Sequence, residues 1–227
     1  IVLKQITYID MKERTETTRE LLIITAGKLF AQLGLDGVST RMITDKANLK
    51  LSSIHYHFGS KENLYIEACR YAKNKGITVT FLTVMDENPT LFHHPEGQAE
   101  IIRNTVFRRF HDYFRPERPT WETQIIARET LSPSSALPLR ADQLFKPEVD
   151  AAINFYKRLR PDASDLEAQS WCDLFFSPLF FYSMAREPIR LIRGENALSD
   201  DFMKEASRNL SRALLLLLDL PIPQDLK

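Results

Sequence analysis

Cysteine and glycine are both scarce in this chain. Its two cysteines, Cys69 and Cys172, are too few for a disulfide framework, and neither lies in a motif that lowers the pKa of a thiol. Only 7 of the 227 residues are glycine, and there is no glycine-rich phosphate loop, G-x-S-x-G elbow or H-E-x-x-H pair. We therefore expect no cofactor, no metal site and no catalytic activity. A helical enzyme using His111 and Glu129 is an alternative that no motif spacing supports.

Long apolar runs are missing as well. The longest, Leu214 to Leu218, is far shorter than the ~20 residues that a membrane-spanning helix needs, so we expect no membrane partner. No charged-then-apolar leader opens the sequence, and two cysteines suit a reducing compartment, so we expect a cytoplasmic protein. The hydrophobic fraction of 44% and the charged fraction of 26% are those of a soluble globular chain.

The chain has no net charge, with 30 basic and 30 acidic side chains, but the two signs are unevenly distributed. Residues 1–75 carry 12 Lys and Arg against 8 Asp and Glu, whereas the remainder carries 18 against 22. A mildly basic front end on an acidic body fits local binding to phosphates. The excess of positive charge in residues 1–75 is too small to establish DNA binding by itself. A protein-interaction adaptor without DNA binding is therefore a second alternative.

The most informative stretch, residues 39–65, reads STRMITDKANLKLSSIHYHFGSKENLY. We interpret it as two short helices joined by a sharp turn and followed by a longer helix. Ser39 or Thr40 can cap the first helix, whose inward residues Ile43 and Ala47 are one turn apart. Asn48 then tolerates the left-handed backbone conformation that a tight turn requires.

The second short helix should cover residues 54–58. Ser52 or Ser53 can cap its start, Gly59 ends it, and Ser60 opens the longer helix. A helix, a short turn and a second helix form a helix-turn-helix motif, which places its second helix in the major groove of DNA.

The second helix has little apolar surface. Only Ile54 and Phe58, four residues apart, can anchor it in a core. Its other side chains are hydroxyls, imidazoles, a phenol and the nearby Lys50, which suit phosphates and base edges. An ordinary surface helix is the alternative interpretation of the same pattern.

The run IHYHFGSKENLY resembles the DNA-binding domain of the tetracycline repressor (TetR) family, and the match extends from about Thr18 to Tyr65. The resemblance implies DNA contacts from the two short helices and a phosphate contact at the start of the third. Arg19 on the first helix can touch phosphate, with a solvated side chain as the alternative. The predicted DNA-binding residues are Arg19, Thr40, Arg41, Lys50, Leu51, Ser52, Ser53, His55, Tyr56 and Lys61. The sequence departs from the family pattern at Asn48, where Gly is usual, and at Lys50, where Ser or Thr is usual, so base preference does not transfer.

We expect an all-α protein with three parts: a flexible arm (residues 1–16), a helix-turn-helix DNA-binding domain (17–65), and a helical effector-binding and dimerisation domain (66–227). Periodicity and proline breaks predict body helices over residues 99–114, 121–131, 137–160 with an interruption at Pro147, 165–186 and 199–220, and a loop over 87–97. The run ITVTFLTV at 77–84 alternates like a strand, but no second strand is available to pair with it, so helix is favoured.

The last two body helices have more apolar surface than one core uses. WCDLFFSPLFFYSM at 171–184 is apolar nearly all the way round, and residues 208–220 behave similarly. This surplus predicts a homodimer interface, with deep burial inside a monomer as the alternative. The resemblance implies the same interface. The residues predicted there are Trp171, Phe175, Leu179, Leu210, Leu214 and Leu217.

Aromatic residues and a proline favour a cavity in the body. Pro178 should kink its helix and open space beside it, where aromatic side chains gather, although plain core is an alternative. The resemblance implies a small-molecule effector in this region, and we expect it to be apolar or amphipathic. The predicted effector-binding residues are Phe107, Phe110, Trp121, Arg128, Phe176 and Tyr182. The overall prediction is a ligand-responsive repressor that binds a palindromic double-stranded DNA operator as a homodimer.

Overall fold

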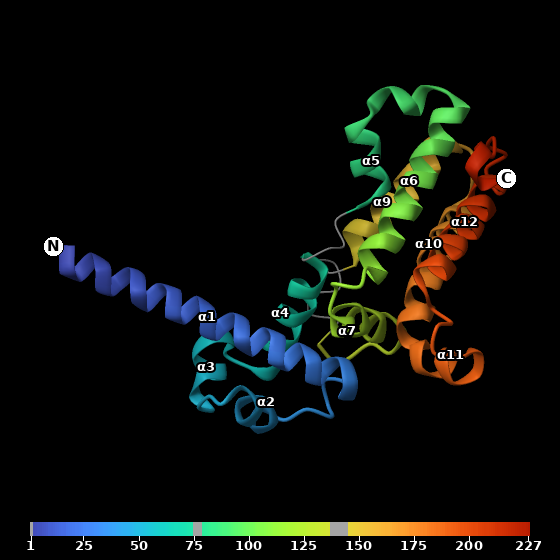
Figure 1. The fold of residues 1–227 in the computed structure, drawn as a ribbon. Coiled ribbons are helices and arrows are strands. Elements are labelled where there is room, and N and C mark those ends of the chain that lie inside the picture. The colour runs from blue at the N-terminus through green and yellow to red at the C-terminus, as the bar shows by residue number, and fades with distance from the viewer. Residues whose placement is uncertain (1, 75–78, 137–144) are drawn as a thin grey trace.

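The computed structural model describes residues 2–74, 79–136 and 145–227, with the backbone alone described for residues 2–15 and 74. Every regular element in these ranges is a helix, which confirms the all-α prediction. Figure 1 shows a head formed by the first helices, a body formed by the later ones, and α7 lying between the two.

The head consists of α1 (Val2–Leu33), α2 (Thr40–Ala47), α3 (Ser52–Phe58) and α4 (Lys61–Asn74). The first helix begins at Val2 rather than near Thr18, so residues 2–16 have a helical backbone where we expected a flexible arm. This N-terminal part of α1 projects away from the other helices (Figure 1). Gly34 ends the helix as expected, because its φ of +75° is a conformation that side chains other than glycine rarely adopt.

The body helices occur mostly where the sequence places them. In chain order they are α5 (Phe81–Glu87), η1 (Pro89–His93), α6 (Pro95–Phe114), α7 (Thr120–Leu131), α9 (Lys146–Leu159), α10 (Asp165–Met184), α11 (Arg186–Arg193), α12 (Asp200–Leu216) and η3 (Gln224–Leu226). The run at 77–84 contributes the start of α5, and its first two residues lie outside the described part of the chain. Residues 137–144 of the predicted helix 137–160 lie outside it as well.

Two details of the body were predicted wrongly. The segment 87–97 is not a loop, because it contains η1 and the first turn of α6. Pro95 fits that first turn, and Nδ1 of His94 accepts a hydrogen bond from the Gly97 amide at 3.0 Å. The short helix α11 was not foreseen. Pro178 lies inside α10 without ending it.

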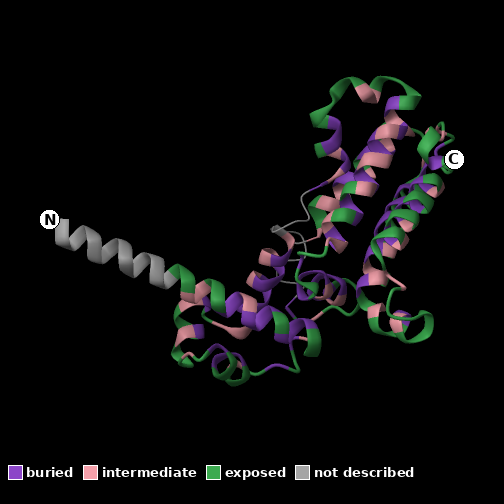
Figure 2. Cartoon of the chain, viewed as in Figure 1, coloured by how far each residue is buried: buried purple, intermediate pink, exposed green. Residues whose placement is uncertain are grey.

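The buried hydrophobic residues of the described chain form two clusters, one in the head and one in the body. Figure 2 shows buried positions in the helices of both parts. The head core also contains Trp121, Ile125 and Ile126 of α7, together with residues of α4 beyond Tyr65. The domain boundary that we predicted after Tyr65 therefore falls inside a packed core. A Cβ on Gly27 would lie 2.2 Å from the Trp121 ring, so only glycine allows α7 to approach α1 this closely.

The second core fills the body and includes most of the predicted dimer residues. Five of these six residues are almost completely buried within the chain itself: Trp171, Phe175, Leu179, Leu210 and Leu214. They cannot contact a second subunit, because α6, α9, α10 and α12 cover one another's apolar faces. Only Leu217, 57% exposed, is free for that role. No helix among the described residues has the length and apolarity that a bilayer span requires.

Candidate functional site

The turn between α2 and α3 has the geometry predicted from its residues. The Ser39 hydroxyl caps α2 by accepting a hydrogen bond from the Met42 amide at 3.1 Å. Asn48 ends α2 in the left-handed region with φ 55°, and Gly59 ends α3 with φ 76°. The predicted serine cap of α3 is wrong. Leu51 occupies the cap position in a helical conformation and makes no side-chain bond, so Ser52 and Ser53 lie in the first turn.

Most of the surface of α3 is not buried against the rest of the described chain. Only Ile54 and Phe58 are buried, as predicted, while Tyr56 is 77% exposed. Nδ1 of His55 lies 3.1 Å from the Gly59 carbonyl oxygen and therefore donates to it. Partial burial, with the Arg19 charge as a second cause, lowers the pKa of His57, so this imidazole is neutral at pH 7.

The other predicted DNA-binding residues of the motif are also accessible. Arg41 is exposed and lies 3.7 Å from the Asp45 carboxylate, and Thr40 is partly exposed beside it. Lys50, Leu51 and Ser52 are exposed, and Ser53 is half-buried. The helices α2 and α3 that carry or flank these residues lie at the opposite end of the molecule from α5 (Figure 1).

Two predicted phosphate contacts come from side chains that already have partners. The Arg19 guanidinium forms an ion pair with Glu67 and lies 5.3 Å from the centre of the Phe58 ring. The Lys61 ammonium donates to the Leu35 carbonyl oxygen at 2.9 Å and to the Val38 carbonyl oxygen at 3.0 Å. Lys61 therefore ties the start of α4 to the segment between α1 and α2, and a phosphate contact by its third N–H stays a prediction.

Replacing Lys61 with alanine should destabilise the head. The two carbonyl groups lose a charged donor, which we expect to lower the free energy of unfolding by about 1–3 kcal/mol. Urea denaturation followed by circular dichroism measures this change. Lys50→Ala is the matched control because Lys50 is exposed, and its unfolding midpoint should be unaltered. Equal midpoints for the two variants would contradict the bracing role of Lys61.

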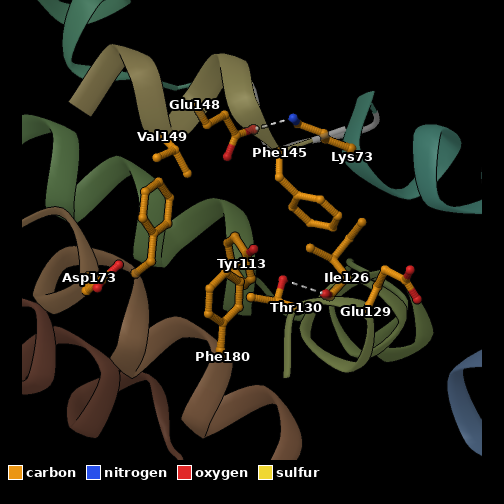
Figure 3. A pocket seen from close by; sticks show the side chains of 11 residues that line it. Lys73, Tyr113, Ile126, Glu129, Thr130, Phe145, Glu148, Val149, Asp173 and Phe180 are labelled. Carbon is orange, nitrogen blue, oxygen red and sulfur yellow. Dashed lines mark hydrogen bonds and ion pairs between the residues drawn. The ribbon is translucent and has the colours of Figure 1, made fainter. Parts of the chain in front are cut away.

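A cavity of about 290 Å³ lies where α4, α6, α7, α9 and α10 meet (Figure 3). Its wall combines aromatic rings, aliphatic side chains, one lysine and three carboxylates. The lining residues are Lys73, Tyr113, Ile126, Glu129, Thr130, Phe145, Glu148, Val149, Asp173, Phe176 and Phe180. Because Lys73 belongs to α4, a molecule in this cavity would touch the helix that follows the exposed α3.

The six predicted effector-binding residues do not share this cavity. Phe176 lines it, whereas Phe107 and Phe110 line a second, larger hollow beside α12. Trp121 is in the head core, stacked on Tyr71 with ring centres 6.2 Å apart.

Two further members of that predicted set are also placed elsewhere. The Arg128 guanidinium donates to the Ala31 and Gln32 carbonyl oxygens, each at 3.0 Å, and so caps the end of α1. The Tyr182 ring packs on Phe114 and Phe202.

Glu129 connects the cavity to the head. Its carboxylate is 1% exposed and accepts hydrogen bonds from the Tyr65 hydroxyl, from the Ser134 amide and from the Ser134 hydroxyl at 2.9 Å. Burial raises the pKa of the Tyr65 phenol, with smaller contributions from Cys69 and from the bond to Glu129. The phenol therefore stays protonated and keeps donating to Glu129 at neutral pH.

Glu148 forms ion pairs with two cations, Lys73 in the cavity wall and Arg109 behind it. The Lys73 ammonium lies 3.3 Å from one of its carboxylate oxygens, and the Arg109 guanidinium binds the other. Arg109 is only 1% exposed, and two of its nitrogens have no hydrogen-bond partner among the described residues. The guanidinium instead lies 5.7 Å from the centre of the Phe176 ring and 6.0 Å from that of Tyr113. Burial raises the pKa of Tyr113 to about 12.

The fold places a helix-turn-helix domain with an exposed second helix on a helical body. Residues 22–68 match the family described as bacterial regulatory proteins, tetR family. This matched segment contains the helix-turn-helix, and it agrees with the resemblance found in the sequence. Members of the family are DNA-binding transcription factors rather than enzymes. No group of three or more His, Cys, Asp or Glu in the described residues is arranged to hold a metal ion.

Part of the chain is similar to a known regulator. The chain is 29% identical over 140 residues to the HTH-type transcriptional dual regulator CecR of Shigella flexneri. That match covers 60% of this chain and 62% of the relative, so it spans less than two thirds of the relative's length.

Solved structures show the same fold at low sequence identity. AibR, crystallised with isovaleryl coenzyme A and operator DNA, superposes over 90% of this chain and 100% of its own, with a TM-score of 0.63 and 15% identity. NalD, the secondary repressor of the MexAB-OprM multidrug efflux pump in Pseudomonas aeruginosa, covers 89% of this chain and 96% of its own, with a TM-score of 0.59 and 14% identity.

Proposed function

We propose that this protein is a ligand-responsive transcription repressor that binds a palindromic operator as a homodimer. One observation carries the proposal: α3 exposes a continuous polar and aromatic surface while only Ile54 and Phe58 hold it in the core. A helix anchored so sparsely contributes little to stability, and its hydroxyl, imidazole and phenol groups suit the major groove. The two copies of α3 would then lie about one DNA turn, ~34 Å, apart.

Exposed apolar side chains support the homodimer. Leu174 and Phe181 on α10, and Leu216 and Leu217 at the end of α12, are exposed although each is apolar. Phe181 is 52% exposed, which is unusual for a phenylalanine in a helix that otherwise fills a core. Since α10 and α12 lie side by side (Figure 1), a second copy related by a twofold axis would cover these side chains.

The cavity supports control by a small molecule. Its wall includes Lys73 of α4, and Glu129 of the same wall binds Tyr65 of α4. A ligand there would change the position of α4 and with it the separation of the two α3 helices. A coupling of about 1–3 kcal/mol between the two sites is enough for regulation.

Tyr56→Ala tests the recognition surface. Its exposed ring makes few contacts within the chain, so we expect unchanged thermal stability and an operator affinity lower by about 1–3 kcal/mol. Selection from random duplex DNA first identifies the operator, and a gel-shift titration then compares the variant with the unaltered protein. Unaltered affinity would refute α3 as the recognition helix.

The same titration at several salt concentrations discriminates the proposed function from its rivals. Phosphate contacts make the logarithm of affinity fall steeply with the logarithm of salt concentration. A flat dependence would favour a protein-interaction adaptor. Matched control DNA of scrambled sequence separates specific from non-specific binding, because both share the phosphate contribution while only the operator has the correct base edges.

A further inference from the structure

One buried carboxylate in the wall of the cavity, Glu129, has no cation partner within the described ranges of the chain. Among the described residues, Glu129 accepts hydrogen bonds only from neutral donors, the Tyr65 hydroxyl and the amide and hydroxyl of Ser134. None of the ion pairs among the described residues of the cavity involves it. Buried charges in proteins are ordinarily paired with an opposite charge. The missing positive charge is therefore one that a ligand can supply.

The described cations near the cavity form ion pairs with a different carboxylate, that of Glu148. Lys73 and Arg109 both bind Glu148, on the α9 side of the cavity (Figure 3). Asp173, on the α10 side, forms no ion pair within the described part of the chain. Counting Arg109 behind the wall, the part of the chain that the structure describes places three carboxylates and two cations around the cavity. Its electrostatic field favours a positively charged guest.

The remaining wall suits the body of such a guest. The rings of Tyr113, Phe145, Phe176 and Phe180 line the cavity, and the labelled rings converge on its interior in Figure 3. Aromatic faces attract cations and also provide apolar contact area. A volume of about 290 Å³ equals the share of roughly ten water molecules, so the guest has on the order of ten non-hydrogen atoms.

We propose that the effector is a small organic ammonium ion, an amine with an aromatic or aliphatic body, whose charged group pairs with Glu129. This rests on the proposed function and specifies its ligand. The same carboxylate holds the Tyr65 hydroxyl of α4, so the ammonium group competes with that phenol for it. Binding of the amine thereby acts directly on the helix that follows the recognition helix.

Three probes of nearly equal size test the charge preference on the unaltered chain: 3-phenylpropylammonium, its neutral analogue butylbenzene, and the anion 3-phenylpropionate. Isothermal titration calorimetry measures each affinity. We expect the amine to bind at least about tenfold more tightly than either of the others, a difference of ~1.4 kcal/mol. Equal binding of the amine and butylbenzene would overturn the proposal. Tighter binding of the propionate would overturn it too, and would point to the two unpartnered nitrogens of Arg109.

The variant Glu129→Gln tests whether the preference for the amine over butylbenzene depends on the charge of Glu129. The amide oxygen still accepts from Tyr65, but the negative charge is gone, so the amine should lose its advantage over butylbenzene. Glu117→Gln, the same change at an exposed position, should leave that advantage intact. If folded Glu129→Gln protein kept the full advantage, the proposal would be wrong. If Glu129→Gln did not fold, the comparison of the three probes would decide.

Failure of this inference is distinguishable from failure of the proposed function. The gel-shift titration of ligand-free protein tests DNA binding alone. A protein that binds its operator but shows no preference for the amine refutes the ligand class only. A protein that prefers the amine but binds no DNA refutes only the proposed function as a transcription regulator.

Discussion

Replacing Glu148 with alanine is expected to lower the free energy of unfolding by about 3–5 kcal/mol, the largest stability effect that we predict for one side chain. The Arg109 guanidinium is buried. Among the described residues, Glu148 is the only carboxylate that accepts a hydrogen bond from it. Lys73 loses its ion pair at the same time. Arg109 would then keep its buried positive charge without this carboxylate, close to the positive charge of Lys73.

Urea denaturation measures this effect, and two further variants sharpen it. Glu148→Gln keeps an oxygen that accepts from Arg109, so it should cost less than the alanine variant. Asp150→Ala on the same helix breaks the exposed Lys146–Asp150 pair and should cost under about 1 kcal/mol. If Glu148→Ala and Asp150→Ala had similar unfolding midpoints, Glu148 would not be the buried counter-charge that the structure assigns.

Introducing a charge at Phe181 should separate the proposed dimer. Phe181→Glu leaves the monomer folded, because the ring is half exposed, but places a carboxylate in each copy of the interface. We expect dimerisation to weaken by about 3–5 kcal/mol, the usual cost of an unpaired buried charge. Analytical ultracentrifugation at micromolar concentration should then find monomers. Operator affinity should fall with it, since each monomer presents only one α3.

Two comparisons complete that experiment. Leu217→Glu, at the far end of α12, should have the same effect, because Leu217 is the exposed member of the predicted interface set. Leu131→Glu alters an equally exposed leucine at the end of α7 and should leave the oligomeric state unaltered. A dimer that survived both Phe181→Glu and Leu217→Glu would show that copies associate through another surface, if at all.

The sequence by itself determined the helix-turn-helix. Its signals are local: a serine at position 39 caps α2, Asn48 turns the chain, and Gly59 ends α3. Each of these depends on backbone conformation within one helical turn, which neighbouring residues largely fix. The exposed face of α3 follows from the same stretch, because Ile54 and Phe58 are the only residues that can anchor it.

Only the tertiary structure decided which side chains of the body face the cavity, the core or the surface. Helical periodicity shows that a face is buried but not what covers it, and α10 is apolar nearly all round, so Trp171 and Phe181 look alike in sequence. The Trp121 ring packs against Gly27, and Glu129 accepts a hydrogen bond from Tyr65, which lies 64 positions earlier in the chain. Such contacts arise from the packing of separate helices, which no local pattern encodes.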